Sequence, residues 1–419
     1  MTEIALIKIS GKDRSGVTST VTQLLSARDA NILDIGQAVI HDNLVLGMLV
    51  ELPIVLTNDI TEFRDTLIAD INSALGDMEL QYEPVTESSY DIWTAEQGKP
   101  RHIVTLLARK ITADHVQRVT ELVSRHALNI DKITRLSGRV PIDDITGSSA
   151  PSSPASKACV EFSLRGELAD ATRVRNELLE LANSLDVDVA YQEDDMFRRN
   201  RRLVVFDMDS TLIDCEVIDE LAKVAGVGSE VAAITESAMR GEIDFQESFR
   251  RRVRLLRGMS ESALQQVAGE LRLTEGAETL IQTLKKLGYK TAILSGGFTY
   301  FGHRLQQQLG FDYVYANDLD IVDGAVTGEV NSRIVDGQRK AELLREIAQR
   351  EGIALEQVIA IGDGANDLPM LSIAGLGVAF RAKPLVKESA RQSISNLGLD
   401  SILYLLGISD RELLARAAE

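Results

Sequence analysis

The sequence predicts an α/β protein in which two small α+β domains precede a larger parallel-sheet domain with an inserted helical region. An unbroken apolar run at residues 203–206 ends in carboxylates, which is typical of a buried parallel strand. Residues 216–272 contain no strand-like run, and one order of strands and helices occurs twice before residue 195. The 419 residues suffice for two or three domains. We expect these domains at 1–95, 96–195 and 196–419.

The first domain is expected to have the element order β-α-β-β-α-β. Apolar strand patterns cover residues 4–9, 44–52 and 80–82. Apolar residues with helical spacing fall within 17–25 and 60–75. This order is the split βαβ, or ferredoxin-like, pattern.

The same order recurs about 100 residues later, which is a period that indicates an internal repeat. The two copies share a short echo, DANILDI at 29–35 and HALNIDKI at 126–133. Between the middle strands of the second copy, residues 146–156 are rich in Ser, Pro and Ala, and we expect a flexible loop. The second copy is predicted to have a strand at 102–110, a helix followed by a strand within 113–133, a strand at 157–166, a helix at 167–183 and a strand at 187–191.

This repeat resembles a tandem pair of ACT domains, small modules that bind amino acids in metabolic enzymes. The first copy carries GKDRSGV at 11–17, similar to the family's turn before its first helix. The second copy has ARKITADHV at 108–116 and lacks both glycines. The resemblance implies either a regulatory ligand or a homodimer formed through these domains, and the spacing alone does not decide between them. The candidate ligand residues are Gly11, Asp13, Gly16 and Asn31.

Composition argues against several partners. The formal net charge of −18, from 45 basic and 63 acidic residues, does not suit nucleic acid or an anionic membrane. No apolar run of transmembrane length and no N-terminal signal pattern is present. The two cysteines, Cys159 and Cys215, are far apart and form no zinc or redox motif. We therefore expect a cytoplasmic protein, with Cys215 as a packing residue.

The predicted strand at 203–206 delivers two carboxylates to one place. Asp207 and Asp209 follow it directly, and alternation along an extended segment turns both to one side, with Met208 facing away. Ligands of parallel sheets bind at the carboxyl ends of the strands. Two close carboxylates repel, and a divalent cation compensates them most simply. The alternative is a helix start, because Asp, Ser and Thr also cap helices.

The helical stretch 216–272 is interpreted as a lid inserted after the first strand of the sheet. Its residues Phe245, Phe249, Arg252 and Leu256 share one helical stripe. An arginine on an apolar stripe is costly unless it meets a carboxylate. Arg252 is therefore either paired with an acidic residue of the lid or a clamp for an anionic ligand group. The neighbouring arginines expected to face solvent are Arg250, Arg254 and Arg257.

Two further segments provide groups suited to an anion. The strand predicted at 289–298 contains Ser-Gly-Gly, where glycines let backbone N–H groups approach a ligand and Ser295 adds a hydroxyl. Lys340 opens a helix predicted at 340–350. A lysine is locally unfavourable at a helix start, so we expect an anionic partner outside the helix.

The last strands complete a Rossmann-like parallel sheet. The strand within 358–371 ends at Gly362 and presents Asp363 and Asp367, with Asn366 beside them, and another strand is predicted at 375–380. Oxygen ligands at this density suit Mg²⁺, which binds through one or two carboxylates plus phosphate. An ionised aspartate can attack phosphorus, and a second can move protons for the leaving group and for water.

These motifs resemble those of haloacid-dehalogenase-like phosphohydrolases: Asp-x-Asp-Ser-Thr at 207–211, Ser-Gly-Gly at 295–297, Lys340, and Gly-Asp-Gly-Ala-Asn-Asp at 362–367. Region 200–395 as a whole is similar to the phosphoserine phosphatases of that superfamily. The resemblance implies a Mg²⁺-dependent enzyme that converts O-phosphoserine to L-serine and phosphate, the final step of serine biosynthesis, through an aspartyl-phosphate. It also implies feedback by L-serine through the ACT-like domains.

The resemblance assigns roles to individual residues. It implies that Asp207 is the nucleophile and Asp209 the acid/base, with magnesium on Asp207, the Asp209 backbone carbonyl and Asp363. Arg252 would hold the carboxylate of the substrate and Glu216 its ammonium group, a pair of charges that selects an amino acid. The residues that match the family's phosphate contacts are Ser295, Gly296 and Lys340. Its other substrate contacts are matched by Met239, Phe245 and Asn366. Asp367 matches the residue that supports the metal ligands.

Two other functions compete with this one. The first is a phosphatase or phosphotransferase for a different small phosphomonoester, which is favoured if Arg252 does not affect substrate preference. The second is an amino-acid sensor that has kept the fold without catalysis, and the intact motifs argue against it.

Overall fold

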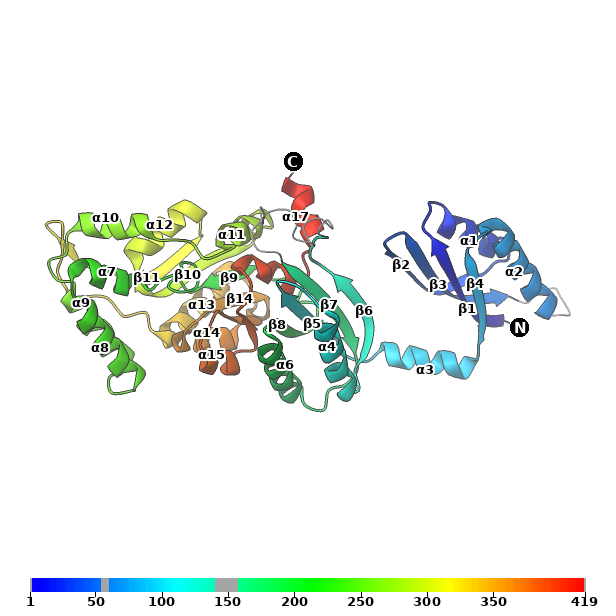
Figure 1. Ribbon diagram of the computed structural model, residues 1–419, viewed down its shortest axis with the longest axis horizontal. Helices are drawn as coiled ribbons and strands as arrows, with labels where there is room; N and C mark the ends of the chain where they lie inside the picture. The colour runs from blue at the N-terminus through cyan, green and yellow to red at the C-terminus, as the bar shows by residue number, and fades with distance from the viewer. Residues whose placement is uncertain (1, 54–59, 140–156, 418–419) are drawn as a thin grey trace. The chain divides into compact units, whose positions relative to one another are not determined.

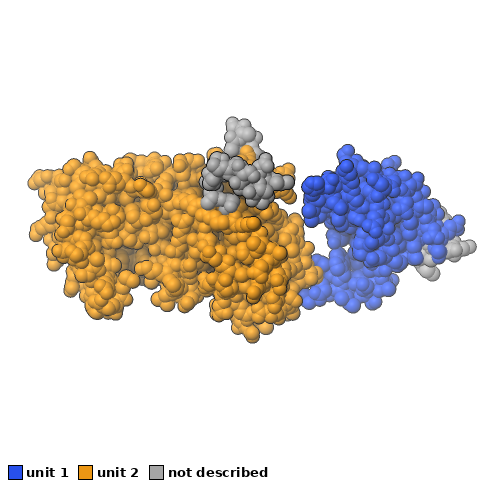
Figure 2. Space-filling model, in the orientation of Figure 1, with its two compact units in different colours: residues 1–99 blue, residues 100–419 orange. Residues whose placement is uncertain are grey.

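Figure 1 shows the computed structural model, which describes residues 2–53, 60–139 and 157–417. The chain divides into two compact units, residues 1–99 and 100–419, drawn in different colours in Figure 2. The predicted loop at 146–156 lies outside the described residues. No helix in the described part of the chain is long and apolar enough to cross a membrane.

The first unit contains an antiparallel sheet with the strand order β2-β3-β1-β4. Residues alternate between buried and partly exposed along β1, so that Ala5, Ile7 and Ile9 face the core formed with the helices. The helix α3 (Glu87–Gln97), capped by Thr86, was not predicted. The remaining elements are β1 (Thr2–Lys12), α1 (Val17–Ser26), β2 (Asn31–Ile40), β3 (Asn43–Pro53), α2 (Ile60–Leu75) and β4 (Glu79–Val85).

The second unit begins with a sheet of the same topology. Its strand order is β6-β7-β5-β8, and its second strand has a register irregularity between Ile130 and Lys132, as the first sheet has between Ile32 and Asp34. The predicted order of elements is therefore confirmed in both copies. The elements are β5 (Arg101–Ala108), α4 (Ala113–Arg125), β6 (Asn129–Arg135), β7 (Ala158–Arg165), α6 (Ala171–Leu185) and β8 (Asp188–Glu193).

The larger sheet of the second unit is parallel, with the order β11-β10-β9-β14-β15-β16, so β9 (Leu203–Phe206) is central. Val204 and Phe206 join the hydrophobic core that contains α11 and α12, whereas Leu203 and Val205 join the core of α13 and α14. Helices thus cover both faces, which explains why the strand has no polar residue. The other strands are β10 (Lys290–Phe298), β11 (Tyr313–Asn317), β14 (Val358–Gly362), β15 (Leu376–Phe380) and β16 (Gln392–Ile394).

Five helices lie between β9 and β10 in the described part of the chain, and an antiparallel bridge between Ile213 and Leu273 closes the base of the insertion that the first four form. A short hairpin turns at Asp323 and Gly324 and joins β12 (Ile321–Val322) to β13 (Ala325–Val326). The inserted helices are α7 (Val217–Ala225), α8 (Gly228–Met239), α9 (Phe245–Leu255) and α10 (Glu261–Glu270). The helices around the sheet include α11 (Ala277–Lys286), α12 (Thr299–Leu309), α13 (Gly337–Glu351), α14 (Leu368–Ile373) and α15 (Pro384–Ser389).

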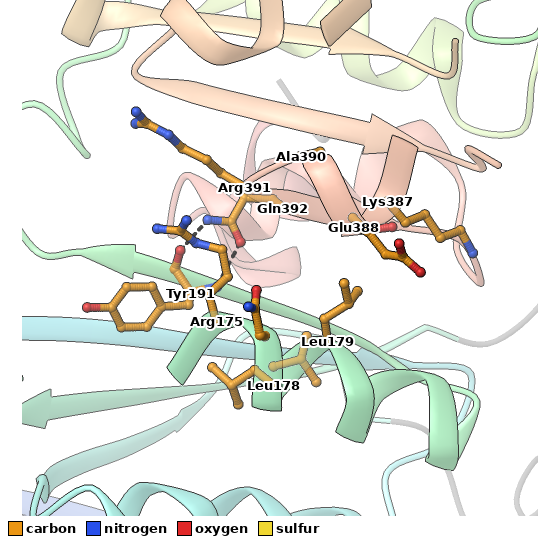
Figure 3. A pocket seen from close by; sticks show the side chains of 12 residues that line it. Arg175, Leu178, Leu179, Tyr191, Lys387, Glu388, Ala390, Arg391 and Gln392 are labelled. Atoms are coloured by element: carbon orange, nitrogen blue, oxygen red, sulfur yellow. Dashed lines mark hydrogen bonds between the residues drawn. The ribbon is translucent and has the colours of Figure 1, made fainter. Parts of the chain in front are cut away.

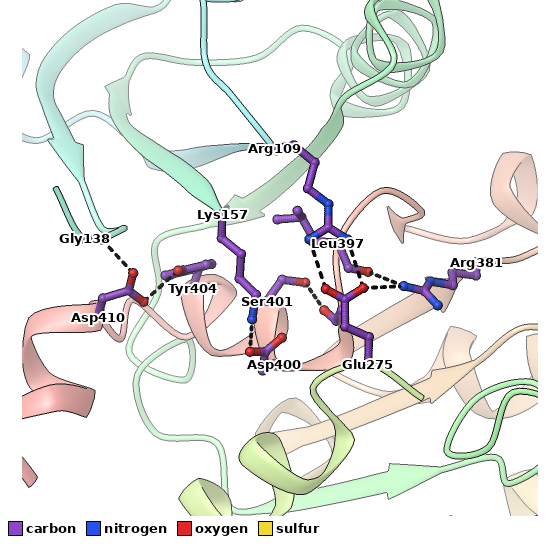
Figure 4. Close-up of polar contacts among 11 residues, drawn as sticks. Arg109, Gly138, Lys157, Glu275, Arg381, Leu397, Asp400, Ser401, Tyr404 and Asp410 are labelled. Carbon is purple, nitrogen blue, oxygen red and sulfur yellow. Dashed lines mark hydrogen bonds and ion pairs between the residues drawn. The ribbon is translucent and has the colours of Figure 1, made fainter. Parts of the chain in front are cut away.

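Polar contacts join the second repeat to the parallel-sheet region. The side-chain amide of Gln392 accepts from the backbone N–H of Tyr191 and donates to the carbonyl of the same residue, beside a pocket between α6 and β16 (Figure 3). Figure 4 shows Glu275 held by Arg109 and Arg381. These contacts cross the predicted boundary at residue 195, so the division of residues 100–419 into two domains stays a prediction.

Candidate active site

Asp207 lies at the carboxyl end of the central strand. One of its oxygens, Oδ1, accepts the N–H of Met208 at 2.7 Å. The following residues form turns, with the carbonyl of Met208 accepting the N–H of Leu212 at 2.8 Å and Ser210 at a positive φ of 55°. The next helix begins only at Val217, so the helix-start alternative is wrong.

Three carboxylates come together at this edge of the sheet. One oxygen each of Asp207, Asp363 and Asp367 lies within 4.8 Å of the others. Asp363 follows β14 and accepts a 3.2 Å hydrogen bond from the Thr211 hydroxyl. Asp367 accepts the N–H of Gly364 at 2.9 Å. The sequence reasoning placed Asp367 behind the metal ligands, and the structure brings it into the same cluster.

Lys340 neutralises part of this cluster. Its Nζ lies 2.9 Å from Oδ1 of Asp207 and 2.7 Å from Oδ1 of Asp367, and its side chain is fully buried. Burial opposes the charged ammonium, but the two carboxylates outweigh it and raise the pKa of Lys340. Lys340 occupies the first turn of α13, which Asp336 caps. The predicted anionic partner of this lysine is therefore confirmed, and it is provided by the protein.

Among the described residues, neither Asp363 nor Asp209 forms an ion pair that would compensate its charge. Burial, together with Asp207 and Asp367, raises the pKa of Asp363 to about 8. Burial, followed by the charges of Glu216 and Asp207, raises the pKa of Asp209 well above its usual value. A cluster of carboxylate oxygens with excess negative charge fits a hard divalent cation such as Mg²⁺.

The Ser-Gly-Gly segment lies within the last residues of β10, where the pairing with β11 is irregular between Leu294 and Phe298. The buried Ser295 hydroxyl accepts the N–H of Gly297 at 2.9 Å. A Cβ on Gly297 would lie 2.5 Å from Oδ2 of Asp209, so only glycine leaves room for that carboxylate. A Cβ on Gly296 would approach the Phe245 ring to 3.0 Å.

Asn317 holds this segment in place and was missed by the sequence reasoning. Its Nδ2 donates to the carbonyl of Gly296 at 2.8 Å, and its Oδ1 accepts the N–H of Val335 at 2.7 Å. The side chain is fully buried. The available signal was its position as the last residue of β11, at the same edge of the sheet as the predicted site.

The insertion contributes Glu216 and Arg252. Glu216 precedes α7 and accepts a 2.8 Å hydrogen bond from the Ser210 hydroxyl. Arg252 is partly buried, its Nε has no hydrogen-bond partner, and it forms no ion pair with the described residues. Burial lowers the pKa of its guanidinium, while Glu216 and Asp219 raise it. The structural-pair alternative for Arg252 therefore has no support in the described part of the chain. The three neighbouring arginines, as predicted, are exposed: Arg250, Arg254 and Arg257.

Not all predicted contacts converge. Phe245 lies against Gly296, and a Cβ on Gly364 would fall 2.2 Å from Oδ1 of Asn366, which places that amide beside the acidic cluster. Met239, at the end of α8, is 68% exposed, so its predicted contact with a substrate stays a prediction.

The residues proposed for a regulatory ligand lie in the first unit. Gly16 precedes α1 with a φ of 94°, which favours glycine. The backbone N–H of Asp13 donates to the carbonyl of Asp42 at 2.6 Å, and Asn31 donates to Glu51 at 3.0 Å. Gly11 lies within β1, one residue before its end. Gly11, Asp13 and Gly16 are therefore grouped around the turn between β1 and α1, but Asn31 lies at the other end of the sheet, because its partner Glu51 pairs with Ile4 whereas Gly11 pairs with Leu44.

Comparisons with known proteins agree with this geometry. The haloacid dehalogenase-like hydrolase family matches residues 204–372, and the ACT domain family matches residues 3–81. A solved haloacid dehalogenase family hydrolase from Salmonella enterica serovar Typhi covers 73% of this chain and 98% of its own, with 31% identity and a TM-score of 0.62. The solved probable phosphoserine phosphatase from Vibrio cholerae covers 77% and 90%, with 33% identity and a TM-score of 0.58.

Two curated relatives match over nearly their whole length. The phosphoserine phosphatase of Streptomyces coelicolor is 42% identical over 97% of this chain and 93% of its own. That of Mycobacterium tuberculosis is 40% identical over 99% and 95%. Identity at this level over both the N-terminal repeats and the parallel-sheet region shows that the chain belongs to the phosphoserine phosphatase family of haloacid dehalogenase-like hydrolases.

Proposed function

We propose that this chain hydrolyses O-phospho-L-serine to L-serine and phosphate with the help of Mg²⁺. The observation that carries the proposal is the cluster of Asp207, Asp363, Asp367 and Lys340. This cluster lies at the same edge of the sheet as the Ser-Gly-Gly segment of β10. Such a cluster suits a phosphoryl group, because it combines a nucleophile, a cation site and donors for phosphate oxygens.

Asp207 is proposed as the nucleophile. Its Oδ1 is held by Met208 and Lys340, and its Oδ2 has no hydrogen-bond partner in the described part of the chain. A carboxylate fixed through one oxygen presents the other in a defined direction, which favours in-line attack on phosphorus. The attack breaks the bond to the serine oxygen and leaves a phosphoryl group on Asp207.

Asp209 is proposed as the acid and base. Burial and the charges of Glu216 and Asp207 raise its pKa, which favours a protonated carboxyl that can give its proton to the departing serine oxygen. As a carboxylate, it then takes a proton from the water that cleaves the aspartyl-phosphate. The glycine at 297 leaves room for this side chain.

The proposed magnesium ligands are Asp207, the Asp209 carbonyl and Asp363, with Asp367 supporting them. When bound, Mg²⁺ would supply positive charge to the transferring phosphoryl group. Lys340 adds a second positive charge, and Ser295 and Gly296 would donate hydrogen bonds to the phosphate oxygens.

Arg252 and Glu216 are proposed to select the amino-acid part of the substrate. A guanidinium without an ion-pair partner among the described residues suits a carboxylate, and Glu216 suits an ammonium group. Phe245, Met239 and Asn366 would complete the contacts. The cytoplasmic location stays a prediction.

We further propose that both N-terminal repeats are ACT domains, that L-serine is their effector, and that they form a homodimer. The equal topology of the two sheets supports the first point. Exposed apolar side chains along the edge strand β2, including Ile35 at 48% and Ile40 at 77%, support association. If L-serine acts through the first repeat, residues 100–419 alone will lose the inhibition that the full chain shows. Unchanged inhibition would place the effect in the second repeat or at the active site.

A phosphate-release screen over small phosphomonoesters, with and without Mg²⁺, tests the proposed function. We expect O-phosphoserine to be the preferred substrate, no turnover in a chelator, and loss of activity in Asp207→Asn. Preference for another phosphomonoester, or full turnover in the chelator, would contradict the proposal.

A further inference from the structure

Two adjacent residues at the N-terminal end of helix α9 of the insertion contact the parallel-sheet region. The ring of Phe245 lies against Gly296. The amide nitrogen of Gln246 donates a 2.8 Å hydrogen bond to Oδ2 of Asp336, and this contact is partly buried. The other side-chain hydrogen bond of α9 in the described part of the chain, between Arg251 and Glu247, stays within the helix.

The acceptor of this hydrogen bond is tied to the proposed phosphate site. Oδ1 of Asp336 accepts the N–H of Arg339 at 2.9 Å and so caps α13, the helix that carries Lys340. The residue before it, Val335, donates its N–H to Asn317, and Asn317 also donates to the carbonyl of Gly296 in the Ser-Gly-Gly segment. The position of Gln246 is therefore coupled to both segments that would hold phosphate.

The same helix carries Arg252. Arg252 lies seven residues after Phe245, on the stripe that also contains Phe249, and the Phe245 and Phe249 rings stack at 6.3 Å. Phe249 in turn contacts Phe298 of β10, with ring centroids 5.6 Å apart. These aromatic contacts hold the middle of α9, whereas the Gln246 hydrogen bond fixes its N-terminal end.

We propose that Gln246 is a positioning residue whose hydrogen bond to Asp336 latches the insertion onto the parallel-sheet region and so aims Arg252 at the carboxylate of the substrate. The proposal rests on the proposed function. A single, partly buried hydrogen bond is weak enough to break when substrate enters and product leaves, yet its geometry is specific. Its loss therefore affects substrate capture more than the phosphoryl-transfer step itself.

The test is Gln246→Glu, which places a second carboxylate against Asp336. We expect the KM for O-phosphoserine to rise about tenfold, equal to about 1.4 kcal/mol, with kcat within about twofold of wild type. For p-nitrophenyl phosphate, which has no carboxylate for Arg252, we expect KM to stay within about twofold, because Oδ1 of Asp336 still caps α13 and keeps the phosphate-binding segments in place. The matched control is Glu247→Gln on the same helix, which removes only the contact with Arg251 and leaves both KM values unchanged.

A second variant reverses the direction of the hydrogen bond. In Gln246→Glu with Asp336→Asn, the new amide donates to the new carboxylate, while its oxygen can still cap α13. We expect this pair to restore KM to within about threefold of wild type. Gln246→Met, which has no donor, will raise KM for O-phosphoserine without repulsion.

Three results would overturn the latch: an unchanged KM in both single variants at 246, no recovery in the double variant, or equal losses for the two substrates. The last would mean that the end of α13 at Lys340 is damaged. Wild-type turnover of O-phosphoserine is measured in the same series, so a failure of the proposed function appears there, separately from any difference between variants.

Discussion

Replacing Lys340 with methionine would remove one buried cation and leave two buried carboxylates without a counter-charge. Nζ of Lys340 lies 2.9 Å from Asp207 and 2.7 Å from Asp367, and the side chains of Lys340 and Asp367 are fully buried. Methionine fills a similar volume without charge, so packing changes little. Removing one partner of a buried ion pair costs about 3–5 kcal/mol. We expect the free energy of unfolding of the metal-free protein to fall by about that amount.

The assay is urea unfolding in chelator and in Mg²⁺, together with phosphate release. In the proposed site a divalent cation lies beside Asp207, so Mg²⁺ will stabilise the variant more than wild type. We expect kcat to fall by about 100- to 1,000-fold, because Lys340 stabilises charge on the phosphoryl group. The raised pKa of Lys340 means that its contribution is complete below the unfolded-state pKa and is lost only as pH rises through the folded-state pKa. The stability difference between wild type and variant will therefore persist between pH 7 and pH 9.

The control is Lys223→Met, which removes an exposed ion pair with Glu220. Exposed pairs contribute about 0–1 kcal/mol, so this variant will unfold close to wild type. Equal unfolding midpoints for Lys340→Met and wild type in chelator would refute the electrostatic reasoning. Retention of more than about a tenth of kcat would refute the proposed catalytic contribution of Lys340.

Three further outcomes are expected. The folded-state pKa of Asp363 is raised to about 8, so between its unfolded-state pKa and that value the carboxyl is ionised mainly in the unfolded chain. The free energy of unfolding of the metal-free protein therefore falls as pH rises through this range. In Asp363→Asn, the unfolding free energy in chelator will therefore decline less steeply with pH, by up to about 1.4 kcal/mol per pH unit, and an unchanged slope would contradict this. Arg252→Met will raise the KM for O-phosphoserine by about 100-fold, because the charge-assisted pair with the substrate carboxylate is lost. The KM for p-nitrophenyl phosphate, which has no carboxylate, will not change. An equal rise of both KM values in steady-state kinetics would favour another phosphomonoester as substrate. Gly297→Ala places a Cβ 2.5 Å from Oδ2 of Asp209, so kcat will fall about 100-fold at an unchanged circular dichroism spectrum. Normal kcat would mean that Asp209 is free to move.

The parallel sheet and its acidic edge were predictable because both depend on local patterns. A four-residue apolar strand with carboxylates directly after it is typical of a buried strand in a parallel sheet, and β9 is buried at every position. Each strand end then carries its chemistry with it, so Asp207, Ser295 and Asp363 converge once the strands align. The convergence needs no knowledge of the loops.

The supporting contacts were not predictable, because their partners are distant in sequence and carry no pattern. Asn317 joins Gly296 to Val335, and Gln246 reaches Asp336 from a different part of the fold. A single asparagine or glutamine has no periodicity, and its hydrogen bonds follow only from the complete backbone arrangement. The third member of the acidic cluster, Asp367, was assigned a supporting role because sequence order cannot give the distance between carboxylate oxygens.

The second repeat shows how one local pattern can have two uses. In the first repeat, the end of β1 and the turn after it carry Gly11 and Gly16, whereas the corresponding segment of the second repeat carries Arg109. Arg109 donates two hydrogen bonds, at 3.0 and 2.9 Å, to Glu275. Glu275 lies two residues after Leu273, whose bridge to Ile213 closes the base of the insertion. A bidentate arginine needs a fixed backbone, and glycines would loosen it. The absence of both glycines is thus explained by this contact, because the turn serves as an attachment to the catalytic region.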